Sequence, residues 1–364
     1  MHRAHVVGSL VRPPELVTAR SRRLAGSLDE ATYAEIEAEA IRQAVALQVR
    51  EGIPEPTDGE QGRFFFGSPL CEGISGIGLG RGWAVEFHDV DGEIDEIASM
   101  FVVRDRLRLE TSPVVEAFRI ARDTHAGTVK VTLPGPYLLA YYWEPGRTSS
   151  IYPDPFDLFA DGVAILRQLI EQLVAAGCRS IQIDQPELTL LGTESEYAQR
   201  FAERSGLPSD AMLGAAPELL NAVVDGFPQV TFGLHVCHGN HVGRWFAWGD
   251  YHVLARKVFS RLQGYDRLLL EFGVERAGGY APLASLPGDQ EVVLGLVSVT
   301  SSSVEHPGAV RAEVEAAARH YDRDLLGLST SCGFASALHS RGLDARMQAA
   351  KLRALVRAAR TIWP

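Results

Sequence analysis

The chain has 364 residues, of which 46% are hydrophobic and 22% charged, and these proportions are typical of a globular protein rather than a disordered or fibrous one. The formal net charge of −11, with no cluster of Lys and Arg to offset it, excludes nucleic acid as an expected partner. No run of about 18 apolar residues and no signal-peptide pattern is present, so we expect a soluble, cytoplasmic protein without membrane association.

Two kinds of segment alternate along the chain. The short apolar or β-branched runs that predict strands are 4–8, 53–57, 128–133, 180–183, 230–236, 268–272, 292–299 and 325–329. The longer segments with helical spacing of apolar residues are 27–51, 155–176, 211–225, 251–262, 308–321 and 343–361. Eight strands that alternate with helices predict an α/β fold, a (β/α)8 TIM barrel rather than an open doubly wound sheet. Because no linker-like tract interrupts it, we expect one catalytic domain over residues 1–364.

Residues 64–109 break this alternation between the second and third predicted strands. Their alternating apolar segments flank Asp91 and Gly92, a pair that favours a tight turn between two strands. We therefore predict an inserted β-hairpin on the loop after the second strand, where it would act as a lid or as an interface.

Reactive side chains follow most of the predicted strands. Barrel enzymes carry their chemistry at the carboxyl ends of the strands, so residues from distant segments are expected to meet at one mouth. The candidates at these positions are Ser9, Asp58, Glu60, Asp184, His235, Cys237, Glu271, Thr300 and Cys332.

Four of these residues suit a zinc ion in type and number. His235 and Cys237 are two positions apart at a strand end and can face the same ion, while Glu271 and Cys332 end two other strands. Glu271 could instead pair with Arg276, and Cys332 could be a buried thiol beside a turn. Since four protein ligands are typical of a closed structural site, catalysis would require one ligand, with Glu271 the candidate, to leave when a substrate thiol arrives. A thiol held by zinc is deprotonated and nucleophilic, which predicts S-alkylation.

Acidic residues at the predicted mouth indicate a second kind of site. Asp58, Glu60 and Asp184 lie there, and their carboxylates could bind the ammonium group of an amino acid. The alternative for each is a helix cap or a salt bridge.

The segments VGSLVRPPEL, PTDGEQGR, IQIDQPEL, HVCHGN, LLLEFGVERAG and STSCGF resemble the catalytic domain of cobalamin-independent methionine synthase. The similarity is to the short, single-barrel form within the superfamily that also contains uroporphyrinogen decarboxylase. It implies a zinc-dependent methyltransferase of methionine biosynthesis that transfers a methyl group to homocysteine. It further implies that zinc is bound by His235, Cys237, Glu271 and Cys332, and homocysteine by Ser9, Glu60 and Asp184, the last two also being the catalytic candidates.

The sequence departs from that family at two places. The family's Asp-Glu-Pro is Asp184-Gln185-Pro186 here, and its Asp-Ile-His is Ser298-Val299-Thr300, which removes the His associated with the folate donor. The methyl donor is therefore left open between methyl-folate, a corrinoid protein and other alkyl donors. Alternative functions are a zinc enzyme resembling epoxyalkane:coenzyme M transferase, a demethylase of a methyl ether or sulfonium, and a metal-free decarboxylase-like barrel. The oligomeric state is also open, with a homodimer among the options.

Overall fold

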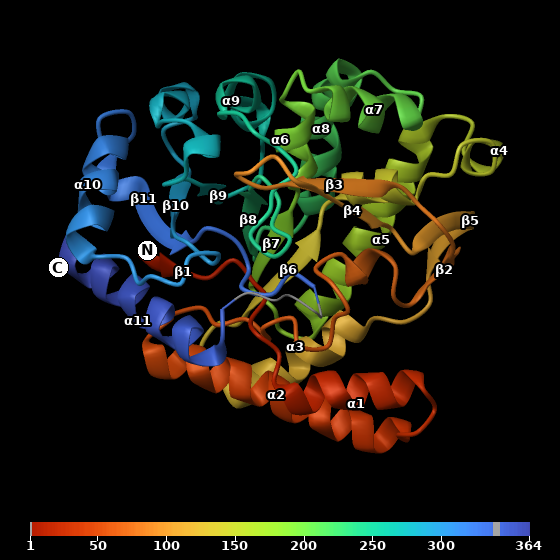
Figure 1. The fold of residues 1–364 in the computed structure, drawn as a ribbon, viewed down its shortest axis with the longest axis horizontal. Helices are drawn as coiled ribbons and strands as arrows, with labels where there is room; N and C mark the ends of the chain where they lie inside the picture. Colours follow the sequence, from red (N-terminus) through yellow and green to blue (C-terminus); the bar gives the residue numbers. More distant parts are fainter. Residues whose placement is uncertain (1, 338–342) are drawn as a thin grey trace.

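Residues 2–337 and 343–364 are described by the structure, which is a computed structural model. Its central feature is a curled parallel sheet of seven strands in the order β1-β11-β10-β9-β8-β7-β6 (Figure 1). These strands are β1 (Ala4–His5), β6 (Lys130–Pro134), β7 (Ser180–Asp184), β8 (Thr231–Val236), β9 (Arg267–Glu271), β10 (Glu291–Val297) and β11 (Leu326–Thr330). The fold is thus a mixed α/β fold of the TIM-barrel-like kind.

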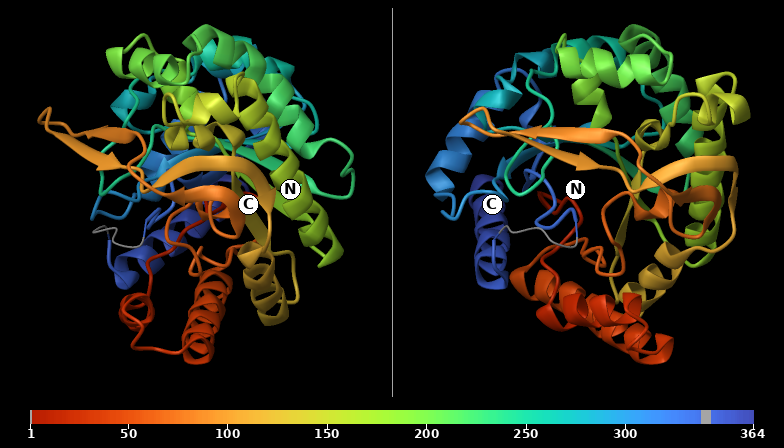
Figure 2. Two further views of the ribbon diagram at one scale, coloured as in Figure 1. Left: turned by 90° about the vertical axis from the view of Figure 1, so that its right-hand side faces the viewer. Right: turned by 45° about the vertical axis from the view of Figure 1, so that its right-hand side comes forward.

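Helices surround the curled sheet on its outside (Figures 1 and 2). The α-helices are α1 (Pro14–Leu24), α2 (Glu30–Glu51), α3 (Pro113–Thr124), α4 (Thr148–Ile151), α5 (Pro155–Ala175), α6 (Glu187–Leu191), α7 (Glu196–Arg204), α8 (Ser209–Val224), α9 (His252–Lys257), α10 (Pro307–Ala317) and α11 (Ala345–Ile362). Short 3-10 helices are η1 (Ser68–Leu70), η2 (Pro136–Tyr142), η3 (Phe259–Arg261), η4 (Glu275–Ala277), η5 (Ala281–Ser285) and η6 (Arg323–Leu325). Among the described residues, none of the helices combines the length and apolar content that a membrane crossing requires.

The strands are buried on both faces. Every residue of β6, β7, β9, β10 and β11 is buried, because one face of the sheet meets the helices and the other meets the interior of the curl. Strands covered on both sides need continuous apolar runs rather than alternation, and this explains why short apolar runs predicted them. Because neighbouring strands of this sheet pair in parallel, their carboxyl ends lie at the same end of the fold.

The second predicted strand, 53–57, is not a strand in the structure. Pro54 and Pro56 have no N–H to donate to a ladder, so the segment cannot pair regularly with its neighbours. Single hydrogen bonds replace the ladder: Lys130 N donates to Pro56 O at 2.9 Å, and Thr57 Oγ1 donates to Gly8 O at 2.8 Å. The segment thus lies between β1 and β6, where an eighth strand was expected, without forming one.

The interval 64–109 contains four strands in two antiparallel pairs. β2 (Ile74–Leu79) pairs with β5 (Phe101–Leu109), and β3 (Ala84–His88) pairs with β4 (Ile94–Ala98) in the register Ala84↔Ala98 to His88↔Ile94. The turn between β3 and β4 includes Gly92, whose φ of 80° suits glycine. Figure 2 shows this β3–β4 pair, coloured orange, as a long ribbon that runs across the fold.

Candidate metal centre and pocket

Three side chains of the kinds that can hold a metal ion meet at the carboxyl ends of β8 and β11. His235 lies near the end of β8, Cys237 follows that strand, and Cys332 follows β11. One ligand atom from each lies within 4.8 Å of the other two, and all three residues are buried. The sulfur atoms of Cys237 and Cys332 are 3.9 Å apart, so the thiols are close but not bonded. The structure thus brings together three of the four residues predicted to bind zinc.

Asp184, at the end of β7, fixes the orientation of His235. Its Oδ1 lies 2.9 Å from His235 Nδ1 and also accepts a hydrogen bond from Gln182 Nε2 at 2.7 Å. The other ring nitrogen, Nε2, is buried and has no hydrogen-bond partner among the residues that the structure describes. A histidine with one nitrogen held by a carboxylate and the other unoccupied is arranged as metal-binding histidines are.

Close contacts between the side chains shift the pKa values of Cys237 and His235. The neighbouring Cys332 thiol and burial together raise the pKa of Cys237 well above the ordinary value. Burial lowers the pKa of His235, but Cys237 and Asp184 outweigh that effect and raise it to about 10. Metal ligands must be deprotonated thiolates and a neutral imidazole, so binding of a cation here would release protons.

Glu271 is not part of the three-residue group. Its Oε2 lies 2.8 Å from His238 Nδ1 and accepts from His238 N at 3.1 Å, while Oε1 accepts from Arg276 at 2.6 Å. Burial favours the neutral acid, but His238 and Arg276 hold the pKa of Glu271 below its usual value. The ion pair with Arg276, considered from the sequence as the alternative, is the contact that the structure contains.

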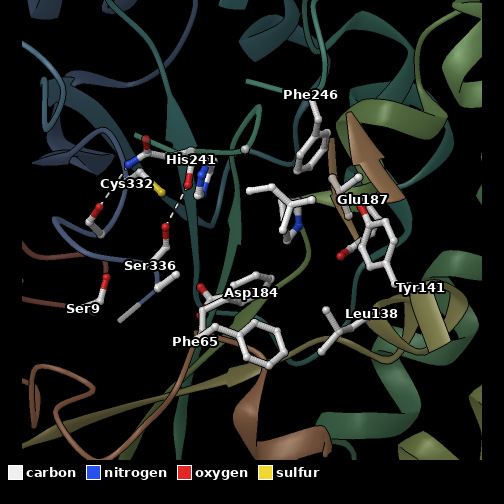
Figure 3. Close-up of a pocket in the computed structure, with 18 of the residues that line it drawn as sticks. Ser9, Phe65, Leu138, Tyr141, Asp184, Glu187, His241, Phe246, Cys332 and Ser336 are labelled. Carbon is white, nitrogen blue, oxygen red and sulfur yellow. Dashed lines mark hydrogen bonds between the residues drawn. The ribbon is translucent and has the colours of Figure 1, made fainter. Parts of the chain in front are cut away.

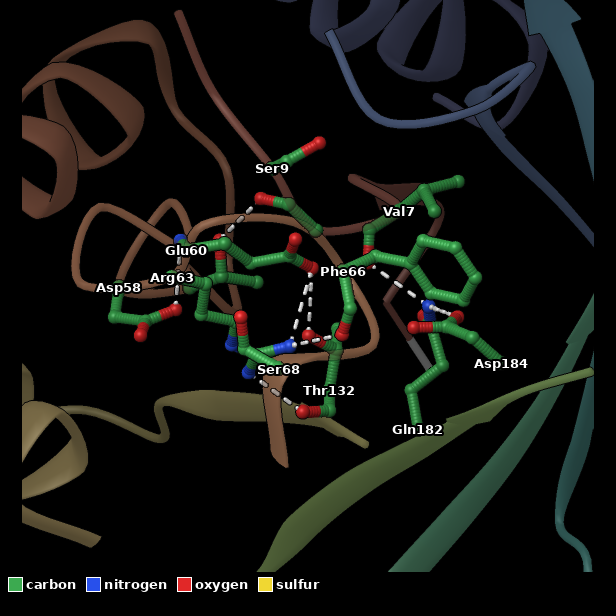
Figure 4. A network of polar contacts seen from close by, with 12 residues as sticks. Val7, Ser9, Asp58, Glu60, Arg63, Phe66, Ser68, Thr132, Gln182 and Asp184 are labelled. Carbon is green, nitrogen blue, oxygen red and sulfur yellow. Dashed lines mark hydrogen bonds and ion pairs between the residues drawn. The ribbon is translucent and has the colours of Figure 1, made fainter. Parts of the chain in front are cut away.

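Glu60 has an unsatisfied carboxylate oxygen directed at the site. Its backbone φ is 54°, which is uncommon for a residue other than glycine and is often found at functional sites. Oε1 accepts from Thr132 Oγ1 at 2.8 Å and lies 3.6 Å from Arg63, whereas buried Oε2 has no partner (Figure 4). Burial is the largest influence on the pKa of Glu60 and raises it, with Asp184 adding to the effect and Arg63 opposing it.

Ser9 joins the ends of β1 and β11. Its Oγ accepts a hydrogen bond from Ala335 N at 3.3 Å, and its carbonyl accepts from Phe334 N at 2.8 Å. Gly333 permits this approach, because a Cβ at that position would collide with the Ser9 hydroxyl. Ser9, Glu60 and Asp184 border the same cavity as His235, Cys237 and Cys332.

That cavity has a volume of about 400 Å³. Figure 3 shows Cys332 on one side of it and Phe246, Glu187 and Tyr141 on the other. The wall away from the metal-binding residues is mainly aromatic and aliphatic, and part of it comes from β3, β4 and β5. The side chains from this interval that border the cavity include Phe64, Phe65, Phe66, Val85, Phe87, Ile97 and Phe101.

Glu187 is a site residue that the sequence analysis did not identify. It begins α6, lines the cavity, is 1% exposed, and its Oε1 has no hydrogen-bond partner. Its Oε2 accepts from Gln185 Nε2. Burial raises the pKa of Glu187 to about 7, although Gln185 opposes the shift. The available signal was its position in IDQPEL, directly after the end of β7.

Sequence comparisons find relatives that match nearly the whole chain. YxjH of Bacillus subtilis, described as uncharacterized, is 29% identical over 373 residues, covering 99% of this chain and 94% of YxjH. Methionine synthase of Pyrococcus furiosus is 24% identical over 362 residues, covering 98% of this chain and 91% of its own length. No protein-family profile matches the chain. The resemblance to methionine synthases noted in the sequence is confirmed over nearly all of its length.

Two solved structures have the same fold. A B12-independent methionine synthase from Shewanella sp. W3-18-1, in complex with selenomethionine, superposes with a TM-score of 0.76 at 20% identity, covering 99% of this chain and 97% of that one. A structure from Listeria monocytogenes, described as that of a candidate vitamin-B12-independent methionine synthase, gives a TM-score of 0.75 at 22% identity, covering 100% and 99% of the two chains. At these identities the likeness establishes the fold.

Proposed function

We propose that the chain, which resembles B12-independent methionine synthases in sequence and fold, is a zinc-dependent methyltransferase that methylates the thiol of homocysteine. The observation that carries the proposal is the group formed by His235, Cys237 and Cys332, whose ligand atoms lie within 4.8 Å of one another while His235 Nε2 has no partner. The methionine synthases among its relatives support the reaction class.

The three residues fit zinc in kind and spacing. Tetrahedral zinc with Zn–S distances of about 2.3 Å holds two sulfurs roughly 3.8 Å apart, and the two thiols here are 3.9 Å apart. Three protein ligands with a fourth position for substrate are typical of catalytic zinc. To reach the ion, Glu271 would have to leave His238 and Arg276, so we assign it the exchangeable fourth place rather than a permanent one.

The chain's own residues would then position the acceptor. When bound, zinc would supply one effect, the conversion of a substrate thiol to its nucleophilic thiolate at neutral pH. The unpartnered Oε2 of Glu60, together with Asp184, would bind the ammonium group of homocysteine, and Ser9 would donate a hydrogen bond to its carboxylate. These roles place the amino acid along one side of the cavity with its sulfur toward the cysteines.

Metal analysis tests the zinc assignment directly. Purified protein loaded with zinc and then dialysed should retain about one ion per chain. Cys237→Ser and Cys332→Ser should lose it, whereas Cys178→Ser, which alters a buried thiol in the segment before β7, should keep it. Wild-type protein that retains no zinc would overturn the proposal.

Calorimetry tests the acceptor. Glu60→Gln should weaken homocysteine binding by about tenfold, since a carboxylate–ammonium contact is lost. The affinity for a thiol of equal length that lacks the amino group should be the same in wild type and in Glu60→Gln. Equal affinity of the wild type for both thiols would rule out homocysteine recognition through Glu60.

Other thiols fit the cavity less well. A sulfonate thiol such as coenzyme M needs a cationic partner, and no Lys or Arg of the described residues borders the cavity. A metal-free decarboxylase would give no role to the two thiols beside an unpartnered imidazole nitrogen.

A further inference from the structure

The cavity contains a second region that the binding of zinc and homocysteine would not use. It lies across from Cys332 and is bounded by ring faces and edges from the interval 64–109, from η2 and from the loop after β8 (Figure 3). We call this region the aromatic chamber; its residues are Phe65, Phe87, Phe101, Tyr141, Phe246 and Glu187.

The rings of the chamber are held in place by one another. Phe87 packs edge-on against Phe246 with centroids 5.9 Å apart, and Phe65 stacks on Phe101 at 6.1 Å. Tyr141 packs against Phe201 at 5.0 Å, and its buried hydroxyl has no hydrogen-bond partner. Ring-to-ring packing therefore holds the aromatic side chains of the chamber against their neighbours.

Glu187 is the exception in this wall. An ionisable carboxyl group in an apolar surrounding is costly unless something compensates it, and its Oε1 has no donor within the described residues. Within the described residues, its side chain accepts a hydrogen bond from the Gln185 amide on Oε2 and from no other side chain. A buried acid in the mainly aromatic and aliphatic wall of the cavity points to a ligand that carries positive charge.

We propose that the aromatic chamber binds the methyl donor, and that this donor is a methylated onium cation, a sulfonium or quaternary ammonium compound. Aromatic faces attract such cations through the ring quadrupole, and a desolvated carboxylate adds a direct charge partner. This inference rests on the proposed function in one respect, namely that a thiol is methylated in the same cavity.

The chemistry of an onium donor agrees with the residues present. The acceptor thiolate attacks the methyl carbon, an S–CH₃ bond forms, and the bond from that carbon to the donor's sulfur or nitrogen breaks. The electron pair of the broken bond stays on the donor, whose positive charge is thereby neutralised. The leaving group is neutral and needs no proton. The reaction therefore does not require the histidine of the family's Asp-Ile-His, which is replaced here by Ser298-Val299-Thr300.

An anionic donor lacks partners in the chamber. Ser9, Glu60, Asp184 and Glu187 line the cavity, while no Lys or Arg does so within residues 2–337 and 343–364. The carboxylates of a folate would therefore face acidic groups, whereas a cation would face them favourably.

Binding can be measured without turnover by comparing two ligands of one shape. Choline carries a trimethylammonium group, and its uncharged isostere carries a tert-butyl group instead. At about pH 8, calorimetry on zinc-loaded wild type should show choline binding about tenfold or more tighter than the isostere. In Glu187→Gln this preference should fall to about threefold or less, with isostere affinity unchanged. Equal affinities in the wild type, or a preference that Glu187→Gln leaves intact, would overturn the inference.

A pair of variants separates the ring from the hydroxyl of Tyr141. Tyr141→Phe keeps the ring and removes only an unpartnered hydroxyl, so choline affinity should stay within about twofold of wild type. Tyr141→Leu removes the ring face and should weaken choline more than the isostere. If both ligands weaken equally in Tyr141→Leu, the ring contributes shape alone and the onium assignment fails.

Turnover distinguishes this inference from the proposed function. Zinc-loaded enzyme with homocysteine and trimethylsulfonium should form methionine and dimethyl sulfide in equal amounts, measured by mass spectrometry and headspace gas chromatography. Methionine formed from methyl-folate or methylcobalamin but not from trimethylsulfonium or glycine betaine would overturn the onium donor and leave the methyltransferase intact. Failure to retain zinc would instead count against the proposed function, while the choline comparison would still decide the chamber.

Discussion

Two buried carboxyl groups face the cavity with one oxygen unpartnered, and their surroundings differ. Glu60 has Arg63 at 3.6 Å and the Thr132 hydroxyl at 2.8 Å. In the described part of the chain, Glu187 forms no ion pair, and its side chain accepts from the Gln185 amide alone. Both pKa values are raised, chiefly by burial. Glu187 is therefore the group whose charge should cost the folded protein most when no ligand is bound.

Replacing Glu187 should stabilise the protein, but only at higher pH. Its pKa rises from 4.5 to about 7 on folding, so the folded state holds the proton more tightly. Stability should fall as the pH rises from about 4.5 to about 7 and then level off, at a total cost of about 3 kcal/mol. Glu187→Gln cannot ionise, so its free energy of unfolding should exceed that of wild type by about this amount at about pH 8.

Denaturant unfolding at two pH values measures this difference. At about pH 5 the wild-type carboxyl is mostly protonated in the folded state, so the two proteins should differ by less than about 1 kcal/mol. The control is Asp210→Asn, an exposed acid paired with Lys257, which should shift stability little at either pH. An equal difference between wild type and Glu187→Gln at both pH values would show that folding does not raise the pKa of Glu187.

The contact between Asp184 and His235 should strengthen metal binding. Asp184→Ala removes the acceptor on Nδ1, frees the imidazole to rotate, and should weaken zinc affinity by about 10- to 100-fold. Asp184→Asn offers an amide oxygen at the same place and should retain most of the affinity. Competition with a chromogenic chelator gives both constants, and equal zinc affinity in wild type and Asp184→Ala would contradict an orienting role.

The grouping of His235, Cys237 and Cys332 could be predicted from the sequence because the pattern that indicates it is local. His235 and Cys237 are two apart at a strand end, and Cys332 follows another strand, so residue type and register were sufficient. Glu271 could not be assigned in this way, because the choice between a metal and Arg276 depends on side-chain placement. Glu187 was missed because an acid one residue after a proline looks like an ordinary helix start; only its burial in the cavity distinguishes it.

Ion pairs and a backbone bridge attach the β3–β4 pair to the loop that follows β8. Arg244, in the loop after β8, lies 2.9 Å from Asp89 and 2.9 Å from Glu93 in the turn, and 3.5 Å from Asp95. His88 and Trp245 form a backbone bridge beside them. Since Phe87 and Ile97 line the cavity, these contacts also position part of the aromatic chamber.

Arg244→Ala should loosen this pair of strands. Partly exposed ion pairs contribute up to about 1 kcal/mol each, so amide exchange within β3 and β4 should accelerate by about tenfold. Exchange in β2 and β5 should change little, as should zinc content, because Arg244 contacts neither. Arg119→Ala removes an exposed pair with Glu116 on α3 and serves as the control. Unchanged exchange in β3 and β4 would show that the backbone bridge and apolar packing suffice.

Sequence patterns predicted the seven strands of the curled sheet, but they also predicted a strand at 53–57 that the structure does not contain. Apolar runs marked the buried parallel strands because both faces of those strands are covered. The run 53–57 has similar composition, yet its two prolines prevent a ladder, and only isolated bonds such as Lys130 N to Pro56 O remain. The interval 64–109 gave a single turn signal at Asp91-Gly92, while the pairing of β2 with β5 connects strands more than twenty residues apart that no local pattern reveals.

The proposed zinc site connects two strands, β8 and β11, that are not neighbours in the curled sheet. In the sheet, β9 and β10 separate β8 from β11. In the sequence, Cys237 and Cys332 are 95 positions apart. An ion held by both ends would restrain the curled sheet across its open interior. Because the unfolded chain has no preformed site, the binding free energy adds to the stability of the fold.

Zinc should therefore raise the melting temperature of the protein. At free zinc about a thousandfold above its Kd, mass action adds about 4 kcal/mol to the free energy of unfolding, which scanning calorimetry would detect as a shift of several degrees. Cys332→Ser should melt at the same temperature with and without zinc, because the link from β11 is lost. Cys178→Ser should melt lower than wild type yet keep the full zinc-dependent shift, since Cys178 lies outside the metal-binding group. An equal shift in the wild type and Cys332→Ser would mean that zinc stabilises the chain at some other place, and the absence of a shift in the wild type would remove the structural basis for the site.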